Sequence, residues 1–281
     1  MSCHTEPDEV CHSQLIMKNI YELKSAKVTK IIVENPTITT LFLKLTDQNK
    51  FHFLAGQFMQ IGLPGFGECP ISISSNPKFS KKYFSLTIRK VGELTEKLNQ
   101  LKVGDTVLCR GPYGNGFPEV KSNLILIGGG CGFIPLRSVY EENKDRKDIK
   151  IQLFIGCRDT DSLVFKDELL KMKTQHDLNI ILEKMVYPEY SKQKGRITDL
   201  LKNKELLPNA KIYICGPDIM FKFVVRALLE RGISPENIFL SLEKRMHCCV
   251  GVCQHCACGT KYVCKDGPVF SYEYLKDFLR Y

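Results

Sequence analysis

A dense cluster of cysteines near the C-terminus constrains this chain more than any other feature. Six of its 13 cysteines fall within residues 248–264. So many thiols in a short segment indicate disulfides in an oxidising compartment or a metal site in a reducing one. The first fifteen residues carry three acidic residues and no basic cluster followed by an apolar run, unlike a secretory signal peptide. We therefore expect a cytoplasmic protein with a metal site in the cysteine segment.

The spacing of four cysteines narrows the kind of metal site. Four residues separate Cys248 from Cys253, two separate Cys253 from Cys256, and seven separate Cys256 from Cys264. This is the plant-type pattern for a [2Fe–2S] cluster, in which each iron takes two thiolates. Four thiolates also suit tetrahedral zinc, but zinc sites more often use two short CxxC motifs, and only one is present here. The spacing favours an iron–sulfur cluster, with the other two cysteines of the segment as surplus thiols.

Composition and charge exclude several classes of protein. The chain has 281 residues, 43% of them hydrophobic and 25% charged, which is typical of a globular protein of about two domains. No stretch approaches the roughly 18 to 20 consecutive apolar residues of a membrane span. The formal net charge is +9, but the basic residues are scattered, so we expect no nucleic-acid partner. Phosphate-bearing cofactors or an acidic partner protein would suit the positive charge.

The pattern of apolar runs predicts two domains before the cysteine segment. Between residues 25 and 110, short alternating runs separated by turn residues indicate a small antiparallel barrel or sandwich, with one helical stretch, LTEKLNQL. From residue 123 to Ser241, strand-like and helical segments alternate, which indicates a doubly wound parallel α/β sheet. The expected parts are a flexible terminus (1–22), the barrel (23–120), the α/β domain (121–241) and a cluster-binding segment (242–281).

Two glycine-containing turns in the α/β domain predict a dinucleotide site. GGGCGFIP starts at Gly128, between a strand-like run and a helix, and CGPDIM starts at Cys215 in the same kind of position. Glycines let the backbone approach a pyrophosphate, and a helix N-terminus contributes free amides. The first turn is not a standard GxGxxG motif, because Pro135 replaces its last glycine. We expect a nicotinamide dinucleotide between the two turns, and two ordinary turns are the alternative.

The order of motifs along residues 25–275 resembles one family. The chain contains, in this order, CPISIS, RKVGELT, GPYGNGFP, GGGCGFIPLRS, GCRD, GRITDLL, CGPDIM and the cysteine segment followed by KYVCKDGPVF. This order is similar to ferredoxin-reductase-like FAD- and NAD(P)-binding subunits. The branch includes the gamma subunit of hydrogenase (sulfhydrogenase), the corresponding subunit of anaerobic sulfite reductase and the electron-transfer subunit of dihydroorotate dehydrogenase. GGGxGxxPLRS, CGPxxMxKF and KYVCKDGPVF look closest to the hydrogenase gamma type.

The resemblance implies a role for each motif. FAD would be bound by the PISIS strand and the RKVGELT turn, through Pro70, Ile71, Ser72, Arg89, Gly92, Leu94 and Thr95. Ser72 would lie near the reactive face of the flavin, which does the chemistry, so no side chain is assigned as a general acid or base. The dinucleotide would be bound by Gly128, Gly129, Gly130, Gly132, Arg158, Cys215, Gly216 and Pro217. The [2Fe–2S] cluster would be held by Cys248, Cys253, Cys256 and Cys264.

Two cysteines depart from the wider reductase pattern. Cys69 stands where that family has an arginine before the Pro-x-Ser of the flavin strand, although the branch named above also lacks the arginine. Cys131 replaces the small polar residue often found in the nicotinamide loop, and we interpret it as a packing cysteine rather than a redox-active one. Arg158 fits a ribose edge or a 2′-phosphate, so the residues leave both NADH and NADPH open.

The predicted function is electron transfer between NAD(P)H, FAD and the cluster, which feeds or drains other redox subunits of a hydrogenase- or sulfite-reductase-like complex. Relatives of the dihydroorotate dehydrogenase type are a further alternative. A self-sufficient reductase would use a soluble acceptor, and a scaffold subunit would use the cysteines as a structural zinc clamp. The N-terminal pairs Cys3-His4 and Cys11-His12 could bind a metal, but we expect a frayed terminus.

Overall fold

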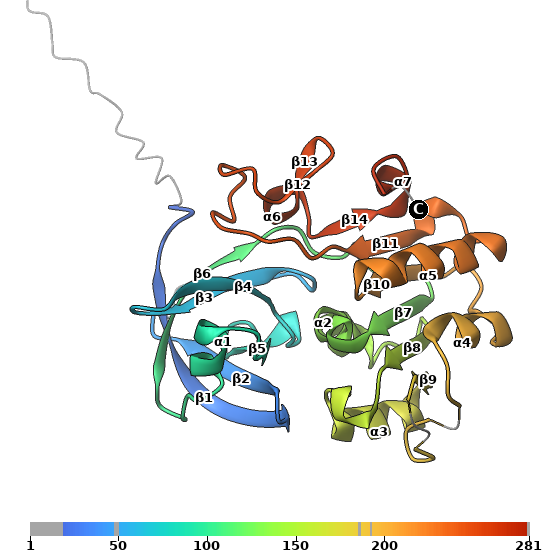
Figure 1. Ribbon diagram of the computed structural model, residues 1–281, viewed down its shortest axis with the longest axis horizontal. Coiled ribbons are helices and arrows are strands. Elements are labelled where there is room, and N and C mark those ends of the chain that lie inside the picture. The colour runs from blue at the N-terminus through green and yellow to red at the C-terminus, as the bar shows by residue number, and fades with distance from the viewer. Residues whose placement is uncertain (1–18, 48–50, 185–186, 192, 280–281) are drawn as a thin grey trace, which may run out of the picture.

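The described residues form two six-stranded β-sheets that follow one another along the chain (Figure 1). A computed structural model describes residues 19–47, 51–184, 187–191 and 193–279. Both N-terminal Cys-His pairs and most of the predicted flexible terminus lie outside these residues. The first sheet is antiparallel and the second mostly parallel, which confirms the two fold classes that the apolar pattern predicts.

The first sheet is a barrel with strand order β4-β3-β6-β1-β2-β5. An antiparallel bridge between Ile73 and Leu86 joins the two edge strands. Alternate side chains such as Leu41, Leu43 and Ile61 fill the interior, as a half-buried sheet requires. Its elements are β1 (Lys24–Asn35), β2 (Ile38–Leu45), β3 (Phe58–Leu63), β4 (Gly67–Ser72), η1 (Pro77–Phe79), β5 (Phe84–Arg89), α1 (Glu93–Leu98) and β6 (Thr106–Tyr113).

The second sheet has the order β14-β11-β10-β7-β8-β9, with β14 antiparallel to β11. The chain starts at the central β7, moves outward to β9 and then returns to β10 on the other side of β7. This reversal is the topological switch point, where open α/β sheets bind ligands. Its strands are β7 (Leu124–Gly129), β8 (Ile151–Cys157), β9 (Asp177–Leu182), β10 (Lys211–Cys215), β11 (Ile238–Ser241) and β14 (Val269–Ser271).

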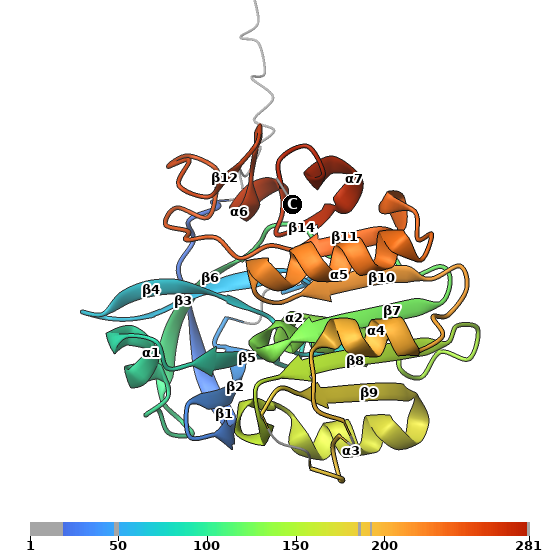
Figure 2. The ribbon, with the colours of Figure 1, turned by 45° about the vertical axis from the view of Figure 1, so that its right-hand side comes forward.

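Helices cover both faces of the second sheet because its strands are apolar on both sides. Leu124 and Leu126 of β7 pack with α2 and α3, while Ile125 and Ile127 pack with α4 and α5 (Figure 2). Alternate residues of a strand point to opposite faces, so one continuous apolar run serves two cores. The helical elements are η2 (Gly130–Gly132), α2 (Phe133–Asn143), η3 (Thr160–Ser162), α3 (Lys166–Gln175), α4 (Ile197–Asn203), α5 (Asp218–Glu230) and η4 (Pro235–Asn237).

The cysteine segment leaves the second sheet at β11 and rejoins it at β14. It lies above the barrel and the sheet in Figure 1 and contains β12 (Ala257–Cys258), β13 (Lys261–Tyr262) and α6 (Val263–Asp266), with α7 (Tyr272–Leu275) after β14. Because Ser241 pairs with Val269, both ends of the segment are held by one pair of strands. In the part of the chain that is described, every helix is too short or too polar to cross a membrane.

Candidate functional site

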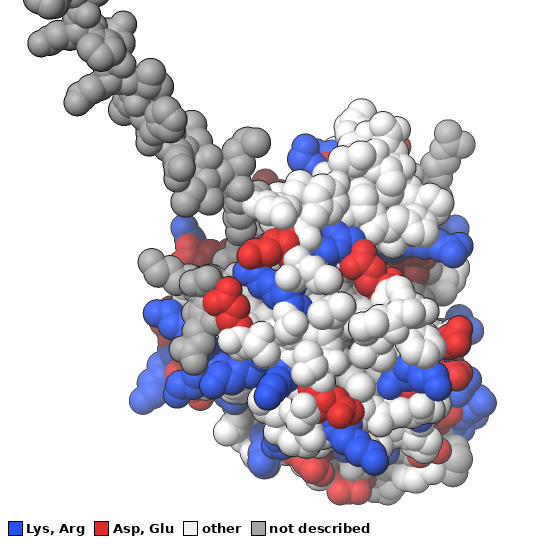
Figure 3. Space-filling view, turned by 90° about the vertical axis from the view of Figure 1, so that its left-hand side faces the viewer, with Lys and Arg blue, Asp and Glu red and all other residues white. Residues whose placement is uncertain are grey.

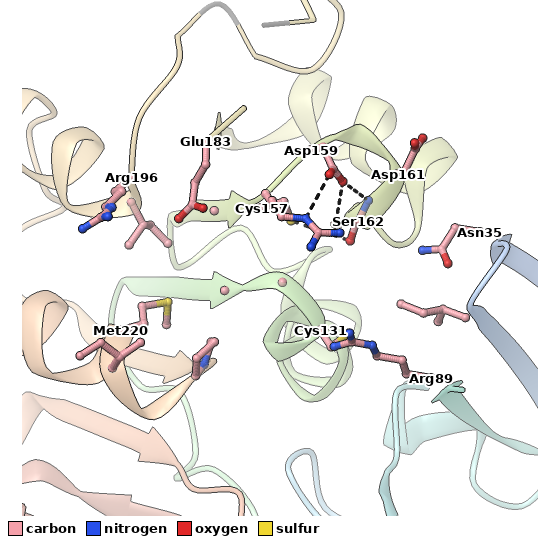
Figure 4. A pocket seen from close by; sticks show the side chains of 18 of the residues that line it. Asn35, Arg89, Cys131, Cys157, Asp159, Asp161, Ser162, Glu183, Arg196 and Met220 are labelled. Atoms are coloured by element: carbon pink, nitrogen blue, oxygen red, sulfur yellow. Dashed lines mark hydrogen bonds and ion pairs between the residues drawn. The ribbon is translucent and has the colours of Figure 1, made fainter. Parts of the chain in front are cut away.

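A cavity of about 750 Å³ lies over the switch point of the second sheet (Figure 4). Its walls come from the loops after β7, β8, β9 and β10, and Arg89 and Asn35 of the barrel complete it. A cavity of this size matches the range for small-molecule and cofactor sites. The structure therefore brings both glycine turns and Arg158 to one cavity: Gly129, Gly130, Arg158 and Pro217 line it directly, while Gly128, Gly132, Cys215 and Gly216 belong to the same two turns.

The two turns touch each other, which explains why glycine is needed there. A Cβ on Gly132 would overlap the backbone carbonyl of Cys215. A Cβ on Gly129 would overlap the Met220 side chain. Because backbone atoms cannot move aside as a flexible side chain can, Gly132 is the stricter requirement. These contacts keep the start of α2 close to the end of β10.

Polar groups along the cavity wall suit a phosphate- and ribose-bearing ligand. The Arg158 guanidinium pairs with Asp159 at 3.2 Å, and Asp159 also accepts hydrogen bonds from the backbone and hydroxyl of Ser162. These bonds, those of Ser162 first, lower the pKa of Asp159. Asn35 is buried, and its Nδ2 has no hydrogen-bond partner among the described residues. A buried amide without a partner is costly.

Arg89 joins the barrel to the dinucleotide cavity. It ends β5, lines the cavity and reaches towards Cys131 on the η2 turn (Figure 4). Burial raises the pKa of the Cys131 thiol, and the nearby Arg89 lowers it by a smaller amount. The net effect raises the pKa of Cys131, which lines the cavity.

The other residues predicted to bind flavin lie on β4 and at the start of α1. Pro70, Ile71 and Ser72 are half-buried residues of β4. The hydroxyl of Thr95 accepts hydrogen bonds from the backbone amides of Val91 (2.9 Å) and Gly92 (3.0 Å). This capping arrangement fixes the turn from Gly92 to Thr95 that includes the half-buried Leu94. The turn starts three residues after Arg89, so one short segment connects the predicted pyrophosphate site to the cavity.

The four spaced cysteines lie together in two pairs. Backbone hydrogen bonds join Cys253 to the sulfur of Cys248 and Cys264 to the sulfur of Cys256. Backbone amides surround these sulfurs: those of Val250 (3.5 Å) and Cys253 (3.3 Å) donate to Cys248 Sγ, that of Gly251 (3.3 Å) to Cys264 Sγ, and that of Cys264 (3.4 Å) to Cys256 Sγ. Such amides stabilise thiolates that bind metal, so the donor set fits a metal cluster.

The electrostatics of the segment set Cys248 apart from its neighbours, but they do not divide the spaced cysteines from the surplus ones, because burial raises the pKa of the spaced Cys264 to about 12 as well. Burial raises the pKa of Cys248, but the amides around its sulfur outweigh burial and bring the pKa down to about 6. For Cys249, burial raises the pKa to about 12. Cys249 and Cys258 are buried in the hydrophobic core. No three His, Cys, Asp or Glu side chains within the described ranges converge on a single metal-ion position.

Two buried arginines belong to this architecture, and the sequence analysis assigns a role to neither of them. Arg137 of α2 donates to the backbone oxygen of Ser74, just beyond β4. Arg110 of β6 donates to the backbone oxygen of Cys248. Arg137 lies within the PLRS part of a recognised motif, but its partner is 63 residues distant. The role of each arginine becomes visible only in the structure, where the barrel packs against the α/β domain and the cysteine segment.

Three family profiles match consecutive parts of the chain. The oxidoreductase FAD-binding domain matches residues 25–117, the oxidoreductase NAD-binding domain matches 126–226, and the iron-sulfur cluster binding domain of dihydroorotate dehydrogenase B matches 243–276. Together with the fold, these matches define the class: an FAD- and NAD-binding oxidoreductase with the ferredoxin-reductase fold and an iron–sulfur segment.

Similar proteins specify the family. The chain is 40% identical to the sulfhydrogenase 2 subunit gamma of Pyrococcus furiosus, over 90% of this chain and 94% of that one. It is 36% identical to a probable dihydroorotate dehydrogenase B electron transfer subunit of Methanocella arvoryzae, over 89% and 91%. A solved NADH-dependent reduced ferredoxin-NADP oxidoreductase superposes with a TM-score of 0.73 and 26% identity, over 90% of this chain and 92% of that chain.

The chain therefore belongs to the family of FAD- and NAD-binding electron-transfer subunits that includes sulfhydrogenase gamma and the dihydroorotate dehydrogenase B electron-transfer subunits. Its function is to relay electrons between NAD(P)H, FAD and an iron–sulfur centre. The family and the function predicted from the order of motifs are confirmed.

Proposed function

We propose that the iron–sulfur centre is a [2Fe–2S] cluster, with Cys248 and Cys253 on one iron and Cys256 and Cys264 on the other. The observation that carries this proposal is that backbone hydrogen bonds join the four cysteines two by two, from Cys253 N to Cys248 Sγ (3.3 Å) and from Cys264 N to Cys256 Sγ (3.4 Å). A binuclear cluster needs two thiolates on each iron, whereas a tetrahedral zinc ion needs four sulfurs around one point. The x4, x2 spacing supports the same assignment.

On the dinucleotide side, the chain's residues bind and orient NAD(P)H. The amides of the turn from Gly128 to Gly132 would face the pyrophosphate at the N-terminus of α2. Arg158 would contact the ribose or its phosphate. The turn from Cys215 to Pro217 would flank the nicotinamide. Exclusion of water from this cavity would protect the transferred hydride.

On the flavin side, the barrel would hold FAD between the dinucleotide and the cluster. Pro70, Ile71 and Ser72 would lie along the ring, and Arg89 with the turn that includes Gly92, Leu94 and Thr95 would bind the pyrophosphate. Bound FAD supplies the conversion between two-electron hydride transfer and one-electron transfer. Arg89 also lines the dinucleotide cavity, so it would set the two cofactors at one junction.

The cluster would exchange electrons with other redox subunits of a hydrogenase-gamma-like complex in the cytoplasm. Seen from the barrel side, the molecule is largely uncharged over the cysteine segment, which forms the upper part of Figure 3. In this segment Val252 is 69% exposed and adjoins the exposed Cys253. Exposed apolar surface beside a redox centre suits contact with a protein partner.

The test is an anaerobic purification of the full chain with metal and flavin quantification and EPR after dithionite. We expect about two irons and one FAD per chain and a reduced [2Fe–2S] signal. The Cys256→Ser variant should lose the signal and keep FAD, whereas the Cys258→Ser variant should keep both. Zinc in place of iron, or equal effects of the two variants, would refute the assignment.

A further inference from the structure

We propose that Arg110 is a positioning residue for the iron–sulfur cluster: it anchors the first cluster ligand to the flavin-binding barrel and raises the reduction potential of the cluster. The inference deepens the proposed function and rests on it. Arg110 lies near the end of β6, has 7% of its surface exposed and contacts two consecutive residues at the start of the cysteine segment, His247 and Cys248.

Every N–H group of the Arg110 guanidinium has an acceptor. Its Nε and one Nη2 hydrogen bind the two carboxylate oxygens of Glu68, with Nε at 2.8 Å. Its Nη1 donates to the Tyr113 hydroxyl and to the backbone oxygen of Cys248, both at 3.0 Å. Its second Nη2 hydrogen donates to the backbone oxygen of His247 at 3.3 Å. A guanidinium has five donors in a rigid fork, so lysine cannot reproduce the set.

The acceptors come from three parts of the chain. Glu68 belongs to β4 and Tyr113 to β6, and these strands flank β3 in the barrel. His247 and Cys248 belong to the cysteine segment. Gln60 of β3 also donates to the His247 oxygen, at 3.3 Å. The barrel thus holds the entrance of the cluster loop through backbone oxygens, independently of the side chains that would bind iron.

The charge of Arg110 gives this anchor an electrostatic effect. Arg110 donates to both Glu68 carboxylate oxygens, and these hydrogen bonds are the main cause that raises the pKa of Arg110, so the guanidinium stays charged. Reduction adds one negative charge to an iron–sulfur cluster. A buried cation next to the backbone of a cluster ligand favours that reduced state, because buried charges are weakly screened. The Glu68 carboxylate acts in the opposite direction, so removal of each charge shifts the potential with opposite sign.

The experiment compares the wild-type holoprotein with three variants, Arg110→Gln, Glu68→Gln and Arg110→Lys, and with one control variant. Anaerobic potentiometric titration followed by EPR gives the potential of the cluster, and iron and FAD contents are measured in parallel. We expect a lower potential in Arg110→Gln and a higher one in Glu68→Gln. The Arg110→Lys variant should keep most of the potential but change the EPR line shape, because the charge remains and the fork is lost. Arg146→Gln, at a pair with Asp148, is the control and should match the wild type.

Wild-type potentials in both Arg110→Gln and Glu68→Gln, or shifts of the same sign in these two variants, would overturn the inference. If Arg110→Gln loses its iron, Glu68→Gln still tests the charge effect, and a potential that does not rise in that variant would overturn the inference. Absence of a [2Fe–2S] signal from the wild type would instead refute the proposed function, so the two failures are distinguishable.

Discussion

Two buried arginines hold the barrel to its neighbours on opposite sides, and they do so by different means. Arg137 joins the barrel to the α/β domain: it binds both Glu168 oxygens at 2.6 and 2.7 Å, donates to Ser74 O at 2.6 Å and lies over the Phe165 ring. We call this contact the dinucleotide seam. The contact of Arg110 with Glu68 and the start of the cysteine segment is the cluster seam.

The two seams differ in what lies behind them. Around Arg137, the partner residues belong to or adjoin regular elements, and a hydrophobic core that includes Leu136 and Val139 supports them. Around Arg110, the partner is a loop in which Cys249 and Gln254 adopt positive φ angles, a conformation that is costly for residues other than glycine. Apolar packing supports both seams, since one core contains Phe58 of the barrel and Val263 of the cysteine segment, but the cluster seam also depends on polar bonds to a loop and on the metal.

Removal of the metal should have the largest effect, and it should break one seam only. A structural metal site contributes its binding free energy to the local fold, so anaerobic chelation should unfold the loop between His247 and Cys264. We expect proteases to cut this loop at least about ten times faster, by analogy with other locally unfolded segments. Limited proteolysis with mass spectrometry measures this, with unchelated protein as the control. Equal cleavage of all three parts would contradict the comparison.

The Gly132→Ala variant should disturb the dinucleotide seam from within. Its Cβ would overlap the backbone of Cys215, so α2 must shift, and α2 carries Arg137. Overpacking of this kind costs about 1–3 kcal/mol, and NAD(P)H binding should weaken by about tenfold or more. Titration with the dinucleotide and thermal unfolding measure the two effects. Gly129→Ala, which meets the flexible Met220 side chain, should have a smaller effect; the reverse order would be evidence against the backbone explanation.

The Arg137→Met variant removes the polar part of the dinucleotide seam. Loss of one partner of a buried ion pair costs about 3–5 kcal/mol; because the Glu168 side chain is 32% exposed, we expect about 2 kcal/mol after screening. NAD(P)H should reduce the flavin more slowly, with an unchanged EPR signal from the cluster. Stopped-flow absorbance and EPR separate these outcomes. The Lys121→Met control removes an exposed pair with Glu119 and should match the wild type.

The smallest expected effect is a pH dependence of stability that comes from Glu142, near the dinucleotide seam. Burial raises the pKa of Glu142, although Lys78 and Arg146 lower it. The folded state therefore holds its proton to higher pH than the unfolded state, and stability falls as pH rises from the usual Glu pKa through the raised one. The Glu142→Gln variant should lose this dependence and gain less than about 0.5 kcal/mol at pH 7. Unfolding curves at pH 4 and pH 7 test it; parallel pH slopes for both proteins would refute it.

The sequence predicts the parts of the site that depend on local chemistry. The spacing of Cys248, Cys253 and Cys256 reflects how a short loop surrounds a cluster, and the glycines after β7 reflect how closely β10 approaches. In β7, alternate residues pack into the cores on the two faces of the sheet, and this too is a local pattern. Each of these patterns lies within a short stretch of sequence, so it can be recognised without knowledge of which distant residues it contacts.

The seams could not be predicted because their partners are distant in sequence. Glu68 and Arg110 meet because β4 and β6 both flank β3, which no spacing indicates. The strand-like pattern also stops at Ser241, whereas Val269–Ser271 adds a further strand to the sheet. Three residues are too few to show a period, so tertiary pairing alone identifies β14.

The pairing of Ser241 with Val269 makes the cluster loop an insertion with adjoining ends. Residues 242–268 therefore begin and end beside each other at the edge of the second sheet, like the loop of a hairpin. A segment with such ends can be shortened, exchanged or lost while the sheet that bears it keeps its strand order. The cluster-bearing segment is thus attached to the dinucleotide-binding sheet at a single place, so its length can differ without a change in the order of the strands.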